Sequence, residues 1–265
     1  MTQCTGTTAA YRRLAALAAT LLAATLVVGC EDEAAPEAAP PPPDPKQELL
    51  AAVPNDQDPA FRFSTSDASG DVSGVVDPVN QGMNIDTVTK DEDFTLEMSF
   101  RMVESRTWVK VNFEGAQDIQ KLMKLPTKWM ELDPARVEEP DTLPTYEGTD
   151  PGNTDAIIRA ATDVQAGEPG TYTGVVDLSA APELADALEG VAALGDAEGQ
   201  LPFSAVVGAD GNLSSLTLEI PAAGKNKASE YVVEYFDFGA TPAVVAFTEE
   251  QAQQAPTAAY DLLNG

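Results

Sequence analysis

The side chains that most often carry out catalysis are scarce in this sequence, apart from carboxylates. The 265 residues include no histidine and two cysteines, Cys4 and Cys30, against 43 acidic and 15 basic residues. Without histidine, neither a Ser-His-Asp nor a Cys-His nucleophilic centre can form, and a zinc site is not expected. The sequence also has no glycine-rich phosphate loop with its lysine. We therefore predict that the protein is not an enzyme and holds no metal or cofactor.

Runs of carboxylates are the remaining candidates for acid–base or metal chemistry. Glu138-Glu139 and Asp91-Glu92-Asp93 are such runs, and Asp86 precedes the second one. Asp86, Asp91 and Asp93 offer the oxygen ligands that calcium prefers, but they do not follow the spacing of an EF-hand loop. In so acidic a chain a close pair arises from composition alone. We interpret these runs as solvated loops rather than catalytic or calcium-binding groups.

Cys30 ends a segment with the features of a secretion signal. The pair Arg12-Arg13 precedes the uncharged residues 14–28, which are too few for a membrane span of about 20 apolar residues. The segment ends in Val27-Val28-Gly29-Cys30, and an acidic run comes directly after it. This resembles the lipobox of bacterial lipoproteins, which implies cleavage after Gly29 and a diacylglycerol on the Cys30 sulfur. The alternative is an ordinary secretion signal with an incidental cysteine.

Removal of residues 1–29 leaves an even more acidic chain. Arg12 and Arg13 are the only charged residues in the removed part, so the net charge falls from −28 to −30. Such a surface repels nucleic acid and anionic head groups, so no nucleic-acid partner is expected. The lipid must therefore hold the protein on the outer face of the cell membrane, and two acyl chains suffice for stable anchoring. With one cysteine left, no disulfide can form within the mature chain.

Residues 31–46 differ in composition from the rest of the mature chain. They are mostly proline, alanine and acidic residues, with no aromatic or β-branched side chain, and cannot build a core. Proline-rich chains extend by about 3.1 Å per residue, so this segment reaches on the order of 50 Å as a spacer. The alternative is a terminus without a spacing role. The predicted organisation is a signal peptide (1–29), a lipidated tether (30–46) and a single domain (47–265).

Alternation of apolar and polar residues predicts strands at both ends of the domain. The clearest is Phe94–Met102, which alternates over nine residues. In the last third, Asp210-Gly211 lies between two apolar runs and predicts a hairpin. The other predicted strands cover residues 61–64, 70–77, 83–88, 107–113, 128–133, 170–178, 203–208, 213–220 and 229–238.

Helices are predicted in the middle of the domain, after a loop over 134–152. The first runs from Asn153 through Val164. The second carries Leu184, Leu188, Val191 and Leu194 on one face. A segment over 249–263 is predicted to be partly helical. Strands that flank two short helices in this order predict an α+β domain.

The order of these segments resembles the actinobacterial lipoproteins of the LppX/LprG type, which have a LolA-like half-barrel. The resemblance covers most of residues 60–245. It implies a curved antiparallel sheet with helices packed on its concave face, and a cavity that can hold acyl chains or lipoglycans. The segments that carry it, besides the lipobox and the early strands, are Trp129–Pro134, Gly170–Asp177 and Leu201–Ser204 leading into Asp210–Leu213.

The apolar and methionine side chains of the early strands are the candidates for such a cavity. Methionine suits an adaptable pocket. The candidates are Phe94, Leu96, Met98, Phe100, Trp108, Met123, Trp129 and Met130. The alternative is that they only fill the core. Two functions therefore stay open: a lipoprotein that binds or carries a lipid, glycolipid or other apolar ligand, and a non-catalytic protein-interaction or envelope-organising module with a filled core.

Overall fold

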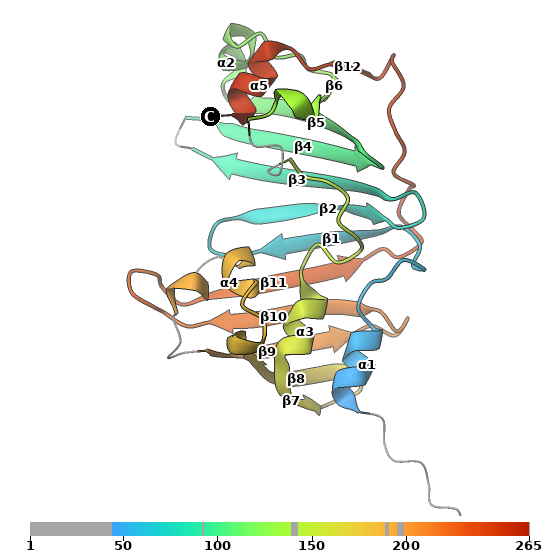
Figure 1. Ribbon diagram of the computed structural model, residues 1–265, viewed down its shortest axis with the longest axis vertical. Helices are drawn as coiled ribbons and strands as arrows, with labels where there is room; N and C mark the ends of the chain where they lie inside the picture. The colour runs from blue at the N-terminus through green and yellow to red at the C-terminus, as the bar shows by residue number, and fades with distance from the viewer. Residues whose placement is uncertain (1–43, 92, 139–142, 189–190, 195–198, 265) are drawn as a thin grey trace, which may run out of the picture. The chain divides into compact units, whose positions relative to one another are not determined.

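The computed structural model describes residues 44–91, 93–138, 143–188, 191–194 and 199–264. In these ranges a large, curved, unclosed and mostly antiparallel sheet of twelve strands dominates (Figure 1). The strands are β1 (Phe61–Ser66), β2 (Asp71–Asp77), β3 (Gly82–Lys90), β4 (Thr95–Val103), β5 (Arg106–Glu114), β6 (Trp129–Glu131), β7 (Ala161–Ala166), β8 (Thr171–Asp177), β9 (Gln200–Val207), β10 (Leu213–Ile220), β11 (Ser229–Phe236) and β12 (Ala252–Gln254).

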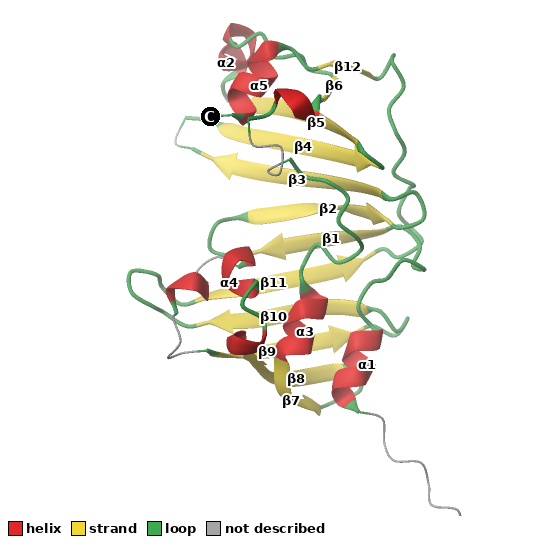
Figure 2. Ribbon diagram, viewed as in Figure 1, coloured by secondary structure: helices red, strands yellow, loops and turns green. Residues whose placement is uncertain are grey.

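The helices are short and lie between or after the strands (Figure 2). No helix in the described ranges has the length and apolar character needed to cross a bilayer. The α-helices are α1 (Pro45–Ala51), α2 (Gln117–Leu122), α3 (Thr154–Ala160), α4 (Leu184–Ala187) and α5 (Thr257–Leu263), and the single 3-10 turns are η1 (Pro134–Arg136), η3 (Leu178–Ala180) and η4 (Val191–Ala193). A curved antiparallel sheet with few helices agrees with the predicted α+β class.

The sheet is built from two meanders that meet in its middle. Its strand order is β12-β6-β5-β4-β3-β2-β1-β11-β10-β9-β8-β7. One meander runs outward from β1 to β6, and the other returns from the opposite edge, from β7 to β11. They join where β1 pairs antiparallel with β11, with Phe63 opposite Tyr235. The chain then crosses back to the first meander, where β12 pairs parallel with β6.

The pairing register gives the sheet one apolar and one polar face, because successive side chains of a strand point to opposite sides. The apolar face carries, in one row across paired strands, Tyr235, Phe63, Gly74, Ile85, Phe100 and Val109. The polar face carries, in the neighbouring row, Glu234, Ser64, Ser73, Asp86, Ser99 and Lys110. The alternation predicted for Phe94–Met102 obeys the same rule.

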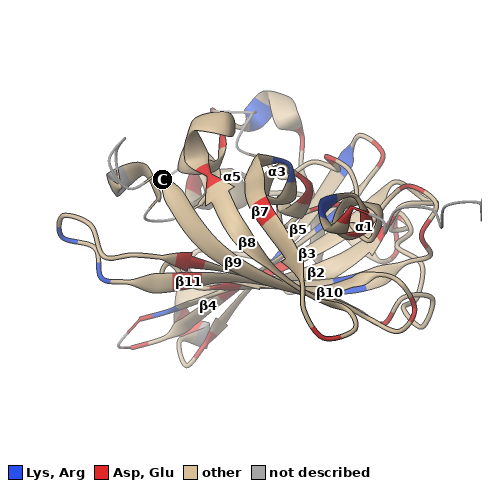
Figure 3. Cartoon of the chain, turned by 90° about the horizontal axis from the view of Figure 1, so that it is seen from below, with Lys and Arg blue, Asp and Glu red and all other residues tan. Residues whose placement is uncertain are grey.

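The main hydrophobic core lies on the apolar face, under the helices. Figure 3 shows α1, α3 and α5 on the same side of the sheet. Leu49 from α1, Ile157 and Ile158 from α3, and Leu184 from α4 are buried in this core. Complete burial of one such side chain contributes about 1.5–3 kcal/mol to the free energy of folding. Packing on the core therefore stabilises these short helices.

Both helices predicted for the middle of the domain end earlier than expected. The first stops at Ala160, and residues 161–166 form the edge strand β7, whose Ala161 pairs with Val176 of β8. The second ends at Ala187, and Leu188 is already extended. Its four predicted apolar residues are nevertheless all buried. Burial of these four side chains therefore does not require one continuous helix.

Helix α1 and its N-cap Asp44 extend the domain three residues toward the predicted tether. The side chain of Asp44 accepts a hydrogen bond from the Lys46 backbone nitrogen (3.0 Å), and Pro45 occupies the first turn. The Lys46 Nζ atom donates to the carbonyls of Arg159 (2.7 Å) and Ala161 (2.8 Å). Residues 44–46 therefore belong to the folded domain. The sequence patterns also predict neither α2 nor β12, which have six and three residues.

Gly74 on β2 provides a test of how tightly this strand packs against Phe63 on β1. A Cβ atom here would lie 2.6 Å from the Phe63 ring and closer still to the Asn84 carbonyl oxygen. We expect Gly74→Ala to lower the free energy of unfolding by about 1–3 kcal/mol through overpacking, measured by urea denaturation. The control is Gly199→Ala, where a Cβ meets no atom within 4 Å. Equal stability of the two variants would contradict this packing.

Candidate functional site

Four of the predicted cavity residues share the apolar face of β4 and the residue before it. Leu96 pairs with Phe113, Met98 with Val111, and Phe100 with Val109 on β5. Phe94 contacts Phe113, with ring centroids 5.7 Å apart. Phe100 is buried, whereas Phe94, Leu96 and Met98 are only half-buried although they pack on the core. These three side chains therefore remain within reach of a molecule on that face.

Met123 and Met130 join the same cluster from two other elements. Met130 lies on β6 opposite Val109 and is fully buried. Met123 comes directly after α2 and packs half-buried against the core. Six of the eight predicted residues thus gather on the apolar face, with Met130 and Phe100 as core and the other four nearer the surface.

Trp108 and Trp129 lie on the opposite, polar face. Trp108 pairs with Arg101 on β4, and Trp129 flanks Met130 on β6. Both pack in a separate cluster with Phe247, whose ring centroid lies 5.7 Å from that of Trp108 and 4.8 Å from that of Trp129. The sheet separates them from the other six residues, so a cavity lined by all eight is excluded.

The structure also forms a groove on the apolar face that the sequence patterns do not reveal. Met83 and Ile85 of β3 form its floor, and residues 143–153, here called the wall segment, form its side. Its volume is about 400 Å³, within the range of about 300–1,000 Å³ typical of small-molecule sites. Ile85 lies one strand away from Phe100 in the pairing register, so the groove adjoins the predicted cavity residues.

Hydrogen bonds at both ends hold the wall segment over the sheet. Near its start, the Thr107 hydroxyl donates to the Pro144 carbonyl (3.3 Å). Toward its end, the Thr149 hydroxyl donates to the Pro54 carbonyl (2.9 Å). The Asp150 carboxylate then accepts hydrogen bonds from the Thr154 hydroxyl (2.9 Å), the Asp155 backbone nitrogen (2.7 Å) and the Tyr235 hydroxyl. This carboxylate links the wall segment to α3 and to the centre of the sheet.

The two tyrosines beneath the wall segment are permanent hydrogen-bond donors. Burial, together with the Asp150 carboxylate, raises the pKa of Tyr235 well above its ordinary value of 10.0. Burial also raises the pKa of Tyr231, whose hydroxyl donates to the Gly152 carbonyl (3.1 Å). Both phenols therefore stay protonated at physiological pH and donate hydrogen bonds that hold the wall segment.

The lining of the groove divides into an apolar and a polar part. Its floor is apolar, and its polar residues belong to the wall segment. Within the described residues, no three histidine, cysteine, aspartate or glutamate side chains are grouped so that they could hold a metal ion. An apolar floor beside a fixed polar wall can orient a small amphiphilic or apolar molecule.

Comparison with known proteins gives no family for the chain: no protein-family model matches it, and no curated protein is significantly similar to it. The resemblance to lipoproteins of the LppX/LprG type therefore remains a prediction that rests on sequence features.

Tyr235 tests the anchoring of the wall segment. Tyr235→Phe removes the hydroxyl of a buried side chain that donates to the half-buried Asp150 carboxylate, so we expect the free energy of unfolding to fall by about 1–3 kcal/mol. In the control, Tyr172→Phe, the hydroxyl donates to Glu48 (3.2 Å). Glu48 is exposed, so water can replace the lost donor. Urea denaturation of both variants measures the difference. A loss for Tyr235→Phe no larger than for Tyr172→Phe would contradict the anchoring role.

Proposed function

We propose that this protein is a lipid-anchored extracytoplasmic lipoprotein that holds an apolar ligand, a lipid or glycolipid, against the apolar face of its sheet. The observation that carries the proposal is a set of half-buried apolar side chains beside the groove on that face. Its members are Val72, Ile85, Phe94, Leu96 and Met98. Each contacts the core and yet keeps part of its surface open to solvent.

The energetics of the apolar face support a ligand there. Covering exposed apolar surface lowers the free energy by about 25 cal/mol for each Å² removed from water. Contiguous apolar patches therefore often mark binding sites. Met98 and Met123 add flexible side chains that can adapt to the shape of an acyl chain. A ligand that covers these residues would extend from the groove along β4.

In this proposal the sheet acts as a half-barrel whose concave side carries the helices. Helices α1, α3 and α4 lie over β7–β11 (Figure 1), and their buried side chains belong to the core. Helices α2 and α5 lie at the other end of the sheet, near β5 and β6 (Figure 1). The space for a ligand is then the middle of the apolar face, over β2–β4, where the half-buried side chains lie.

The anchor in this proposal is the lipid on Cys30, which lies outside the described residues. The mature chain carries a net charge of −30, so attraction to anionic head groups cannot bring it to the membrane. A diacylglyceryl group supplies the two acyl chains that stable anchoring needs. The tether then sets the distance at which the domain works.

A protein-interaction or envelope-organising module with a filled core is the second candidate. The fully buried Leu49 and Ile157 favour it, because side chains from the helices already occupy a large part of the apolar face. The two candidates differ in whether an apolar molecule binds over β2–β4.

Met98 and its neighbour Ser99 allow a matched test of ligand binding, because they point to opposite faces of β4. Residues 42–265 are one compact unit by their internal contacts, and the test uses this part of the chain without the lipid. We expect Met98→Gln to weaken binding of a neutral naphthylamine dye about five- to tenfold, since the ligand loses part of a buried apolar contact. Ser99→Gln, the control, should leave binding unchanged. Equal affinities of both variants, measured by dye fluorescence, would rule out a ligand site on this face.

The two cysteines allow a matched test of the anchor. Cys30→Ala removes the thiol that would carry the lipid, so we expect the chain to leave the detergent phase in a phase-partition assay. Cys4→Ala, within the predicted signal peptide, should keep the chain in the detergent phase, with the mass of a diacylglyceryl group on the mature N-terminus. Retention of Cys30→Ala in the detergent phase, with that added mass, would refute lipidation at Cys30.

A further inference from the structure

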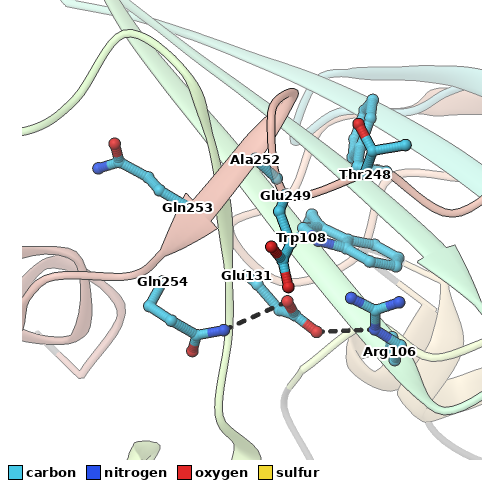
Figure 4. Close-up of a pocket in the computed structure, with 9 residues that line it drawn as sticks. Arg106, Trp108, Glu131, Thr248, Glu249, Ala252, Gln253 and Gln254 are labelled. Carbon is cyan, nitrogen blue, oxygen red and sulfur yellow. Dashed lines mark hydrogen bonds and ion pairs between the residues drawn. The ribbon is translucent and has the colours of Figure 1, made fainter.

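The pairing register and the alternation along each strand turn every lysine and arginine of β1–β5 to the polar face of the sheet. These residues are Arg62, Lys90, Arg101, Arg106 and Lys110. Arg101 pairs with Trp108, and Arg106 is ion-paired with Glu131 (2.7 Å) beside a hollow on that face (Figure 4). These strands therefore offer no cation to an anionic group on their apolar face.

The groove adds two carboxylates to the apolar face. Its described lining residues include Glu147 and Asp150 of the wall segment and no lysine or arginine. Glu147 is exposed, and its Oε1 atom accepts a hydrogen bond from the Thr145 hydroxyl (3.3 Å). Asp150 is half-buried and holds the wall segment in place through the hydrogen bonds given above. The polar side of the groove is therefore negatively charged.

The polar groups of the wall segment are better suited to accept hydrogen bonds than to donate them. A carboxylate such as that of Glu147 only accepts. The Thr145 hydroxyl already donates to Glu147, and Pro144 and Pro151 have no backbone N–H group. The exposed Asn153 amide can both donate and accept. A ligand group at this wall is therefore bound best when it brings hydrogen-bond donors.

The half-buried apolar residues beside the groove have uncharged neighbours. Val72 pairs with Thr65 on β1 and with Thr87 on β3, and Thr87 pairs with Met98 on β4. The Thr87 hydroxyl donates to the Met98 carbonyl (3.4 Å). A polar head group placed here would lose water without gaining partners. The hydrocarbon part of a ligand fits this region, and its polar end fits the wall segment.

We infer that the groove selects an amphiphile whose head group donates hydrogen bonds and carries no negative charge. This inference rests on the function proposed above and narrows the class of its ligand. Hydroxyl-rich and ammonium head groups share the required chemistry. A carboxylate or phosphate head group would instead place a negative charge beside Glu147 and Asp150, with no cation among the lining residues to pair with it.

Amphiphiles with the same dodecyl chain and different head groups test this selection. The whole mature chain, residues 30–265, is made without the signal peptide and the lipid and is loaded with the neutral naphthylamine dye. Dodecyl maltoside, dodecyltrimethylammonium and dodecyl phosphate then compete with the dye, each below the concentration at which it forms micelles. We expect the phosphate to displace the dye at least about tenfold more weakly than either of the others.

Two other outcomes of this competition are distinguishable. Displacement by dodecyl phosphate as strong as by either of the other two would overturn the inference, and the proposed apolar ligand site would still stand. A dye that does not bind, or that no amphiphile displaces, would overturn the inference together with the proposed function.

Charge reversal on each face separates the groove from the charge of the whole chain. Glu147→Lys places a cation in the groove, whereas Glu249→Lys makes the same change of charge beside the hollow on the polar face (Figure 4). Both residues are exposed, so the fold tolerates either substitution. We expect Glu147→Lys to tighten binding of dodecyl phosphate about tenfold, and Glu249→Lys to leave it unchanged. An equal effect of the two substitutions, or no effect of Glu147→Lys, would contradict selection by the groove.

Discussion

The pairing of β1 with β11 is the contact on which the rest of this structure depends. It joins two meanders into one sheet through two strands that are far apart in the sequence, with Phe63 opposite Tyr235 at the seam. Long-range pairing of this kind requires the chain entropy of a long loop to be offset by packing. Phe61 and Phe63 provide this packing, since both are buried at the seam and Phe61 packs edge-on against Tyr235. The Tyr235 hydroxyl then fixes Asp150, and with it the wall segment.

Strand geometry separates two kinds of surface on the same sheet. Side chains that alternate along β4 and β5 place Met98 and Phe100 toward the helices, and Arg101 and Trp108 toward the crossover. One face therefore offers apolar contact and the other offers fixed hydrogen-bonding groups. An apolar ligand would use only the first of these faces.

The strands were largely predictable from the sequence, because alternation and turn residues are local signals. Phe94–Met102 and the hairpin at Asp210-Gly211 both appear where expected, as β4 and as the β9–β10 turn. The side on which Trp108 lies was not predictable, since Thr107, Trp108 and Val109 are all buried and give no alternation. The groove was not predictable either, because the wall segment has no periodic pattern and reaches its place through Asp150 and other distant contacts.

Binding of an apolar ligand is tested most directly by native mass spectrometry of the protein purified from a bacterial membrane, together with lipid extraction. A ligand on the apolar face predicts about one additional apolar molecule per folded chain, recovered in the extract and absent after unfolding. Recovery of a folded chain of bare mass, with no gain on addition of a glycolipid, would contradict lipid binding and leave the filled-core module as the function of this domain.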